Sequence, residues 1–156
     1  MDENFQLFLN SMDTNIQELV TSLHHLLLEH GYLCEVKKAK SGYLVSYLSK
    51  ASKRTIASFV TRKSGLKLRM YPDHIGTYQA ILDTFPSNMK KEIQKSSLCK
   101  RLVNPDDCNP KCKQGFTFTM DDVLYQKCRY MAFMPTVTEK SYPFIKALLE
   151  NELAIV

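Results

Sequence analysis

The apolar residues of the first thirty positions recur with the spacing of a helix. Successive members lie mostly three or four positions apart, which makes one apolar stripe on a helical surface. The stripe consists of Ile16, Leu19, Val20, Leu23 and Leu27. We expect this helix to begin near Asp13 or Thr14 and to end at His30-Gly31, because glycine tolerates the left-handed backbone that often follows a helix. Residues 3–10 predict a shorter helix before it.

Between residues 32 and 71 the pattern changes to short runs of strand-forming residues. Polar turn segments separate four such runs, at 32–38, 43–49, 55–62 and 66–71. The gaps are too short for a crossover helix, so neighbouring strands must pair as antiparallel hairpins. This pattern predicts a four-stranded antiparallel meander.

Helical spacing returns after the meander. It predicts a helix over 75–85, which Pro86 ends, and a further basic helix from Ser87 or Asn88 to about residue 103.

The last third predicts a hairpin and a closing helix. Residues 115–120 alternate like a strand, 121–122 are a turn, and 123–134 contain one or two returning strands, with a last helix after Ser141. We therefore expect one α+β domain over residues 1–156. Its N-terminal, central and C-terminal helices should pack on the meander, with a cysteine-bearing hairpin in the subregion of about 99–130.

The length and the termini bear on the class of protein. A chain of 156 residues is long enough to bury a core without disulfides or metals. It contains no apolar run of the roughly 18–20 residues that span a bilayer. The acidic start, Met-Asp-Glu-Asn, differs from the basic start of a secretory signal. We therefore expect a cytoplasmic protein with no membrane partner, whose thiols stay reduced.

The positive charge is concentrated in the meander. Residues 35–70 contain ten lysines and arginines against the single acid Glu35. Residues 1–34 contain no lysine or arginine. Alternation in the fourth run places Lys67 and Arg69 on the face opposite Leu66, Leu68 and Met70. Such a face suits an anionic ligand or nucleic acid, although a solvated sheet surface explains the same pattern. The candidate binding residues are Lys37, Lys38, Lys40, Arg54, Lys63, Lys67 and Arg69.

Four of the five cysteines fall within thirty residues: Cys99, Cys108, Cys112 and Cys128. A structural zinc site needs four such soft ligands, usually with one tight pair on a turn. The segment Cys108-Asn109-Pro110-Lys111-Cys112 supplies that pair with turn-forming residues between its cysteines. Reduced core thiols and thiol redox chemistry are the alternatives. The remaining Cys34 is expected in the core.

The sequence favours a non-enzyme. It contains no glycine-rich phosphate loop, nucleophile elbow or metalloprotease motif. His74 follows Pro72-Asp73 at a junction between strand and helix, where a turn or cap explains it equally well. A zinc ion with four cysteine ligands has no open position and is structural.

Two segments resemble a signature of small uncharacterised bacterial proteins. They are Cys108-Asn109-Pro110-x-Cys112-x-x-Gly115-Phe116-x-Phe118 and Tyr125-x-Lys127-Cys128-Arg129-Tyr130, about a fifth of the chain. The resemblance implies a bacterial cytosolic α+β protein and supplies no catalytic residues. Our leading hypothesis is a binding or regulatory module with a structural zinc. A thiol-dependent redox enzyme or sensor and a protein-interaction or homo-oligomerisation domain are the alternatives.

Overall fold

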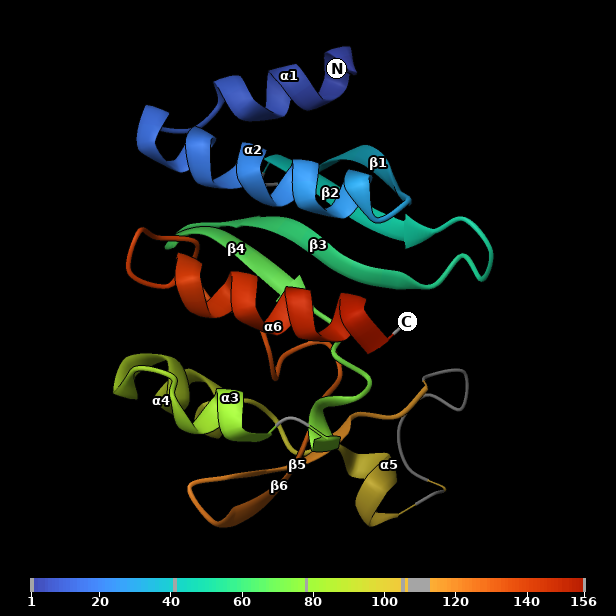
Figure 1. Ribbon diagram of the computed structural model, residues 1–156, viewed down its shortest axis with the longest axis vertical. Coiled ribbons are helices and arrows are strands. Elements are labelled where there is room, and N and C mark those ends of the chain that lie inside the picture. The colour runs from blue at the N-terminus through green and yellow to red at the C-terminus, as the bar shows by residue number, and fades with distance from the viewer. Residues whose placement is uncertain (1, 41, 78, 105, 107–112, 156) are drawn as a thin grey trace. The chain divides into compact units, whose positions relative to one another are not determined.

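A four-stranded sheet and a separate two-stranded hairpin form the β-structure of the computed structural model (Figure 1). The structure describes every residue except 1, 41, 78, 105, 107–112 and 156. The chain divides into two units. Unit 1 comprises residues 1–70 and 135–146, and unit 2 comprises 71–134 and 147–156.

The sheet of unit 1 is the predicted meander. Its strands follow one another in the order β1-β2-β3-β4, and every neighbouring pair is antiparallel. Their bounds are β1 (Tyr32–Ala39), β2 (Gly42–Ser49), β3 (Thr55–Arg62) and β4 (Gly65–Met70). Segment 135–137 adds to the outer edge of β4, where the Leu68 amide donates to the Pro135 carbonyl at 3.1 Å and the Val137 amide to the Leu66 carbonyl at 2.8 Å. This pairing covers an edge that would otherwise be open to other chains.

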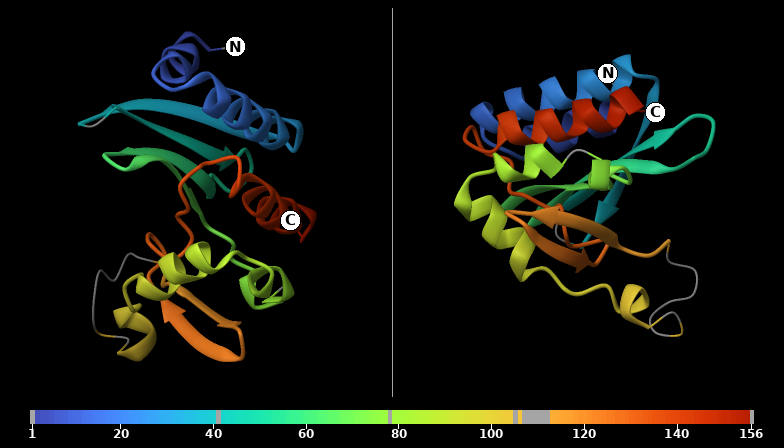
Figure 2. Two further views of the ribbon diagram at one scale, coloured as in Figure 1. Left: turned by 90° about the vertical axis from the view of Figure 1, so that its left-hand side faces the viewer. Right: turned by 60° about the horizontal axis from the view of Figure 1, so that its bottom comes forward.

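Two helices lie on one face of this sheet (Figures 1 and 2). They are α1 (Glu3–Asn10) and α2 (Thr14–Glu29), at the positions that the apolar stripe predicts. The face beneath them carries two cross-strand rows: Val36, Val45, Phe59 and Leu68 form one, and Cys34, Tyr47, Ala57 and Met70 form the other. Phe8 of α1 contacts Phe59 with ring centroids 5.8 Å apart, which joins the helices to the sheet in one apolar core.

Unit 2 contains a hairpin and a set of short helices. The hairpin pairs β5 (Phe116–Met120) with β6 (Val123–Lys127) through the turn residues Asp121 and Asp122. Both turn residues have positive φ, 50° and 65°, as a two-residue turn between twisted strands requires. Phe118 is buried against Phe133, with ring centroids 5.0 Å apart. The helices are η1 (Ile75–Thr77), α3 (Gln79–Asp83), α4 (Ser87–Lys95) and α5 (Lys100–Val103).

The last helix, α6 (Tyr142–Ile155), begins directly after Ser141, as predicted. Its residues up to Lys146 belong to unit 1, and those from Ala147 belong to unit 2. These elements confirm the α+β class with an antiparallel meander, and a single α+β domain fits them. Within the described part of the chain, no helix combines the length and hydropathy that a membrane span needs.

Two predicted helices are wrong in extent. The helix predicted over 75–85 is divided into the 3-10 turn η1 and the short α3. The helix predicted to reach residue 103 ends at Lys95, because the backbone of 97–99 instead hydrogen-bonds to the end of β6. The region 123–134, for which one or two strands were predicted, contains one, β6, which ends at Lys127.

Candidate functional site

The structure brings Cys99 and Cys128 onto two paired segments of unit 2. Leu98 and Lys127 form an antiparallel bridge, and the flanking amides of Cys99 and Cys128 donate to the carbonyls of Gln126 (3.0 Å) and Ser97 (2.7 Å). In this register Cys99 lies opposite Gln126. Cys128 is two positions after Gln126 and therefore on the same face, which makes it the diagonal neighbour of Cys99. Diagonal neighbours have Cα atoms about 7–8 Å apart, a separation that two ligands of one metal ion can span.

Gly115 completes this arrangement from a third segment. Its amide donates a hydrogen bond to Cys99 Sγ at 3.2 Å. A Cβ atom at position 115 would collide with the carbonyl oxygen of Lys127 and lie 2.9 Å from Cβ of Cys99. In general, a hydrogen bond donated by an amide stabilises a thiolate more than a thiol. The thiolate is the form of cysteine that binds a metal. The Gly115 amide therefore contacts the sulfur of the buried Cys99 directly.

The other two predicted ligands, Cys108 and Cys112, lie outside the described residues. Among the residues that are described, Cys34, Cys99 and Cys128 are free thiols, and no group of three metal-ligating side chains is found. Cys99 was predicted on the C-terminal part of a helix, which is wrong because it precedes α5 in an extended conformation. The zinc site itself stays a prediction.

Cys34 lies half-buried in β1 and belongs to unit 1, whereas Cys99 and Cys128 belong to unit 2. Its thiol hydrogen-bonds with the side chain of Tyr47, and burial raises the pKa of Cys34 to about 11. A thiol with so high a pKa is a poor nucleophile at neutral pH. Its place on the apolar face of the sheet agrees with the core position expected from the sequence.

The basic residues of the meander divide into two groups. The register aligns Lys37, Leu44, Val60 and Lys67 in one row, and Glu35, Ser46, Ser58 and Arg69 in the next. Lys37, Lys67 and Arg69 thus share the face opposite Leu68 and Met70. That face is not open throughout, because Ser58 and Val60 are buried and Lys67 and Arg69 are half-buried. Nζ of Lys67 donates to Oγ1 of Thr136 at 3.2 Å.

Lys37 is exposed in β1, and further exposed cations lie at or next to the hairpin turns. Lys38 is near the end of β1, Lys40 lies in the β1–β2 turn, and Lys63 lies in the β3–β4 turn. The two turns are at the same end of the sheet, because Gly42 lies against Thr61: a Cβ added there would be 2.9 Å from its Oγ1. Arg54, just before β3, is half-buried at the opposite end.

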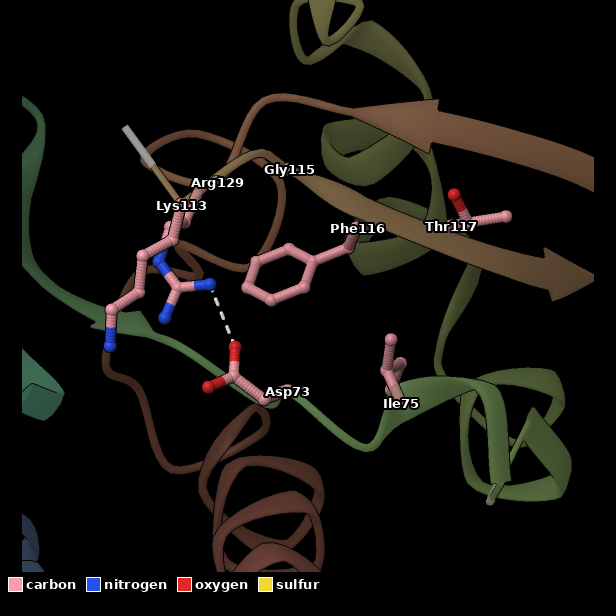
Figure 3. A pocket seen from close by; sticks show the side chains of 7 residues that line it. All are labelled: Asp73, Ile75, Lys113, Gly115, Phe116, Thr117 and Arg129. Carbon is pink, nitrogen blue, oxygen red and sulfur yellow. Dashed lines mark hydrogen bonds and ion pairs between the residues drawn. The ribbon is translucent and has the colours of Figure 1, made fainter. Parts of the chain in front are cut away.

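Unit 2 also contains a pocket of about 310 Å³ beside the cysteine site. Its lining residues are Asp73, Ile75, Lys113, Gly115, Phe116, Thr117 and Arg129 (Figure 3). Sequence reasoning did not select this pocket. The only indications were the position of Arg129 directly after Cys128 and of Asp73 directly before His74, and neither pattern shows that the two residues meet.

His74 is held by a buried carboxylate. Its Nδ1 lies 3.0 Å from Oε1 of Glu152, which is 1% exposed. The same carboxylate accepts hydrogen bonds from the amides of Asp73 (3.1 Å) and His74 (3.3 Å). Glu152 thus secures the junction between β4 and η1 from the last helix, and this structural contact explains the position of His74.

Neither the protein families, nor the curated proteins, nor the solved structures provide a match to this chain. The resemblance of the two cysteine segments to bacterial proteins therefore stays a prediction. Function has to be inferred from the sites themselves.

Proposed function

We propose that the chain is a non-enzymatic binding module of the bacterial cytoplasm. In this proposal a structural zinc ion on Cys99, Cys108, Cys112 and Cys128 stabilises unit 2, and the basic residues of unit 1 bind an anionic partner such as nucleic acid. The observation that carries it is the arrangement of Cys99 and Cys128 on one face of paired segments, with the Gly115 amide donating to the Cys99 sulfur.

Three features support zinc at this place. Cys99 and Cys128 are diagonal neighbours in the register of two paired segments, and the Cys99 sulfur accepts a hydrogen bond from a backbone amide. Cys112 is three positions before Gly115 in the sequence, and three residues span at most about 11 Å, so it is within reach of the Cys99 sulfur. Four thiolate ligands would close the coordination sphere, so the metal would contribute to folding and not to catalysis.

Metal content tests this directly. Protein purified without chelator is expected to contain one zinc ion per chain by elemental analysis. Cys128→Ser should lose the metal, because three ligands hold a structural zinc far less tightly than four. The matched control is Cys34→Ser, which removes the cysteine of β1 and should leave the zinc content unchanged. Metal-free protein with four freely titrating thiols, or with a disulfide among these cysteines, would contradict the proposal and favour the redox alternative.

The basic surface is best tested at its exposed turns. Lys38 and Lys63 lie at the same end of the sheet and are exposed, so reversing their charge should not affect folding. If they contact phosphates, binding to single-stranded DNA or heparin should weaken as salt rises, since each contact releases condensed counterions. The double variant Lys38→Glu/Lys63→Glu is expected to reduce the magnitude of the slope of log K against log salt by about 1.4 on single-stranded DNA, which is about 0.7 for each lost phosphate contact.

A matched double variant controls for net charge. Lys91→Glu/Lys95→Glu makes the same change on exposed positions of α4 in unit 2, and it should leave the salt slope nearly unchanged. Equal losses in the two variants would show that only net charge matters. In that case the lysines of the meander are a solvated surface.

A further inference from the structure

Arg129 is an almost fully buried cation in unit 2. It is 8% exposed, and its guanidinium carbon lies 5.2 Å from the ring centre of Tyr71 and 5.3 Å from that of Phe116. One Nη donates to Oδ1 of Asp73 at 2.7 Å. Two aromatic contacts and one ion pair therefore hold the guanidinium in a single orientation.

This pairing uses only part of the hydrogen-bonding capacity of Arg129. A guanidinium has five N–H donors, and a single carboxylate oxygen accepts one of them here. In the described part of the chain, Asp73 is the acceptor to which Arg129 donates. The side chain also lines the pocket, so its remaining donors lie beside a space that a ligand can enter.

The rest of the pocket determines what kind of ligand fits. Lys113 is exposed and adds a second cation, so the described lining residues carry two positive charges against the one carboxylate of Asp73. In the view of Figure 3 Lys113, Arg129 and Asp73 lie toward the left, the ring of Phe116 lies near the centre, and Ile75 lies to its right. Phe116 and Ile75 are the apolar side chains among the described lining residues. A volume of about 310 Å³ is at the lower end of the range for small-molecule sites and exceeds the need of a bare inorganic anion.

We propose that this pocket binds a small organic oxyanion, with its carboxylate or phosphate group on Arg129 and Lys113 and a flat apolar body against Phe116 and Ile75. The site is distinct from the basic turns of unit 1 and uses none of the cysteines. It is therefore a second binding function of the chain, and its ligand is a small molecule and not a polymer.

Nuclear magnetic resonance titration of the full chain tests the proposal. Benzoate is expected to bind with a dissociation constant in the millimolar range and to shift the amide signals of Phe116 and Thr117. Benzamide has the same shape without the charge and should not bind.

Acetate and inorganic phosphate, which lack the apolar body, should bind more weakly than benzoate and phenyl phosphate respectively. The tighter of those two aromatic probes identifies the preferred anionic group. Equal binding of benzamide and benzoate, or no shift of these signals with any probe, would overturn the inference.

Two variants locate the contact. Lys113→Gln changes an exposed residue and should weaken benzoate binding about three- to tenfold, whereas Lys91→Gln, on α4, should leave it unchanged. Arg129→Lys keeps the charge but loses the planar fork, and its effect should be larger. Arg129 also supports the fold, so Arg129→Lys could unfold and lose its dispersed spectrum. In that case the result for Lys113→Gln alone decides the proposal. Equal effects at Lys91 and Lys113 would overturn the site. Zinc content measured on the same sample separates failure of the pocket from failure of the metal site.

Discussion

Replacing Gly115 with alanine is expected to destabilise unit 2 by about 3 kcal/mol or more, because a methyl group has no space there. The new Cβ would collide with the Lys127 carbonyl oxygen, a rigid backbone atom next to the end of β6. Relief requires the backbone of Gly115 to move away, which would also break the hydrogen bond from its amide to Cys99 Sγ. The free energy of unfolding of the full chain, from urea denaturation followed by circular dichroism, measures the loss.

Gly76 provides the matched control. A Cβ added there would meet its nearest neighbour, the carbonyl oxygen of Thr117, at 3.7 Å, which is an ordinary contact. Gly76→Ala should therefore change the free energy of unfolding by less than about 1 kcal/mol. If the two variants are equally stable, the packing of Gly115 against Lys127 and Cys99 is looser than the structure has it.

Acidification from neutral pH to about pH 4 is expected to weaken unit 1 through His24, by at most about 3 kcal/mol. Burial, with a smaller contribution from the neighbouring His25, lowers the pKa of His24 from 6.5 to about 4. Its neutral ring stacks on Phe5 with ring centroids 3.9 Å apart, and its Nδ1 lies 2.8 Å from the Tyr47 hydroxyl. Between pH 6.5 and pH 4 the His24 imidazole binds a proton in the unfolded chain but stays neutral in the folded chain. Stability due to this group is complete above pH 6.5, falls through this window, and changes no further below it.

The variant His24→Phe isolates this effect, because carboxylates also titrate in the lower part of the window. The variant should lose the part of the pH dependence that belongs to His24. His25→Gln, at an exposed position on the same helix, should retain nearly all of it. Free energies of unfolding measured at pH 7 and pH 4.5 for the three proteins give the comparison. Identical pH dependence in wild type and His24→Phe would show that the pKa of His24 is the same in the folded and unfolded chains, and would contradict the lowered pKa.

Local patterns were sufficient for unit 1. The apolar stripe of α2 and the alternation of the four strands depend on residues within one or two turns of each other, so the sequence alone predicts them. Short polar connections then require antiparallel pairing, and the register follows from the turns. The same alternation assigns Lys67 and Arg69 to one side of the sheet. It does not show that they are half-buried, and the Thr136 hydroxyl that Lys67 contacts is 69 positions away in sequence.

Long-range pairing decided the structure of unit 2. Helical spacing continues past Lys95 in the sequence, yet the amide of Cys99 bonds with the carbonyl of Gln126, and this partner in the hairpin outweighs a weak local preference. Cysteine spacing predicted a cluster, whereas the face shared by Cys99 and Cys128 depends on that pairing.

The pocket shows the same division most clearly. Arg129 and Asp73 are 56 positions apart, and Glu152 reaches His74 from 78 positions away. Composition and periodicity thus determined the fold class, the meander and the candidate metal ligands, because each is a property of neighbouring residues. Only the tertiary structure decided which buried charges meet, because a buried ion pair requires partners that the folded chain brings together and that no local pattern specifies.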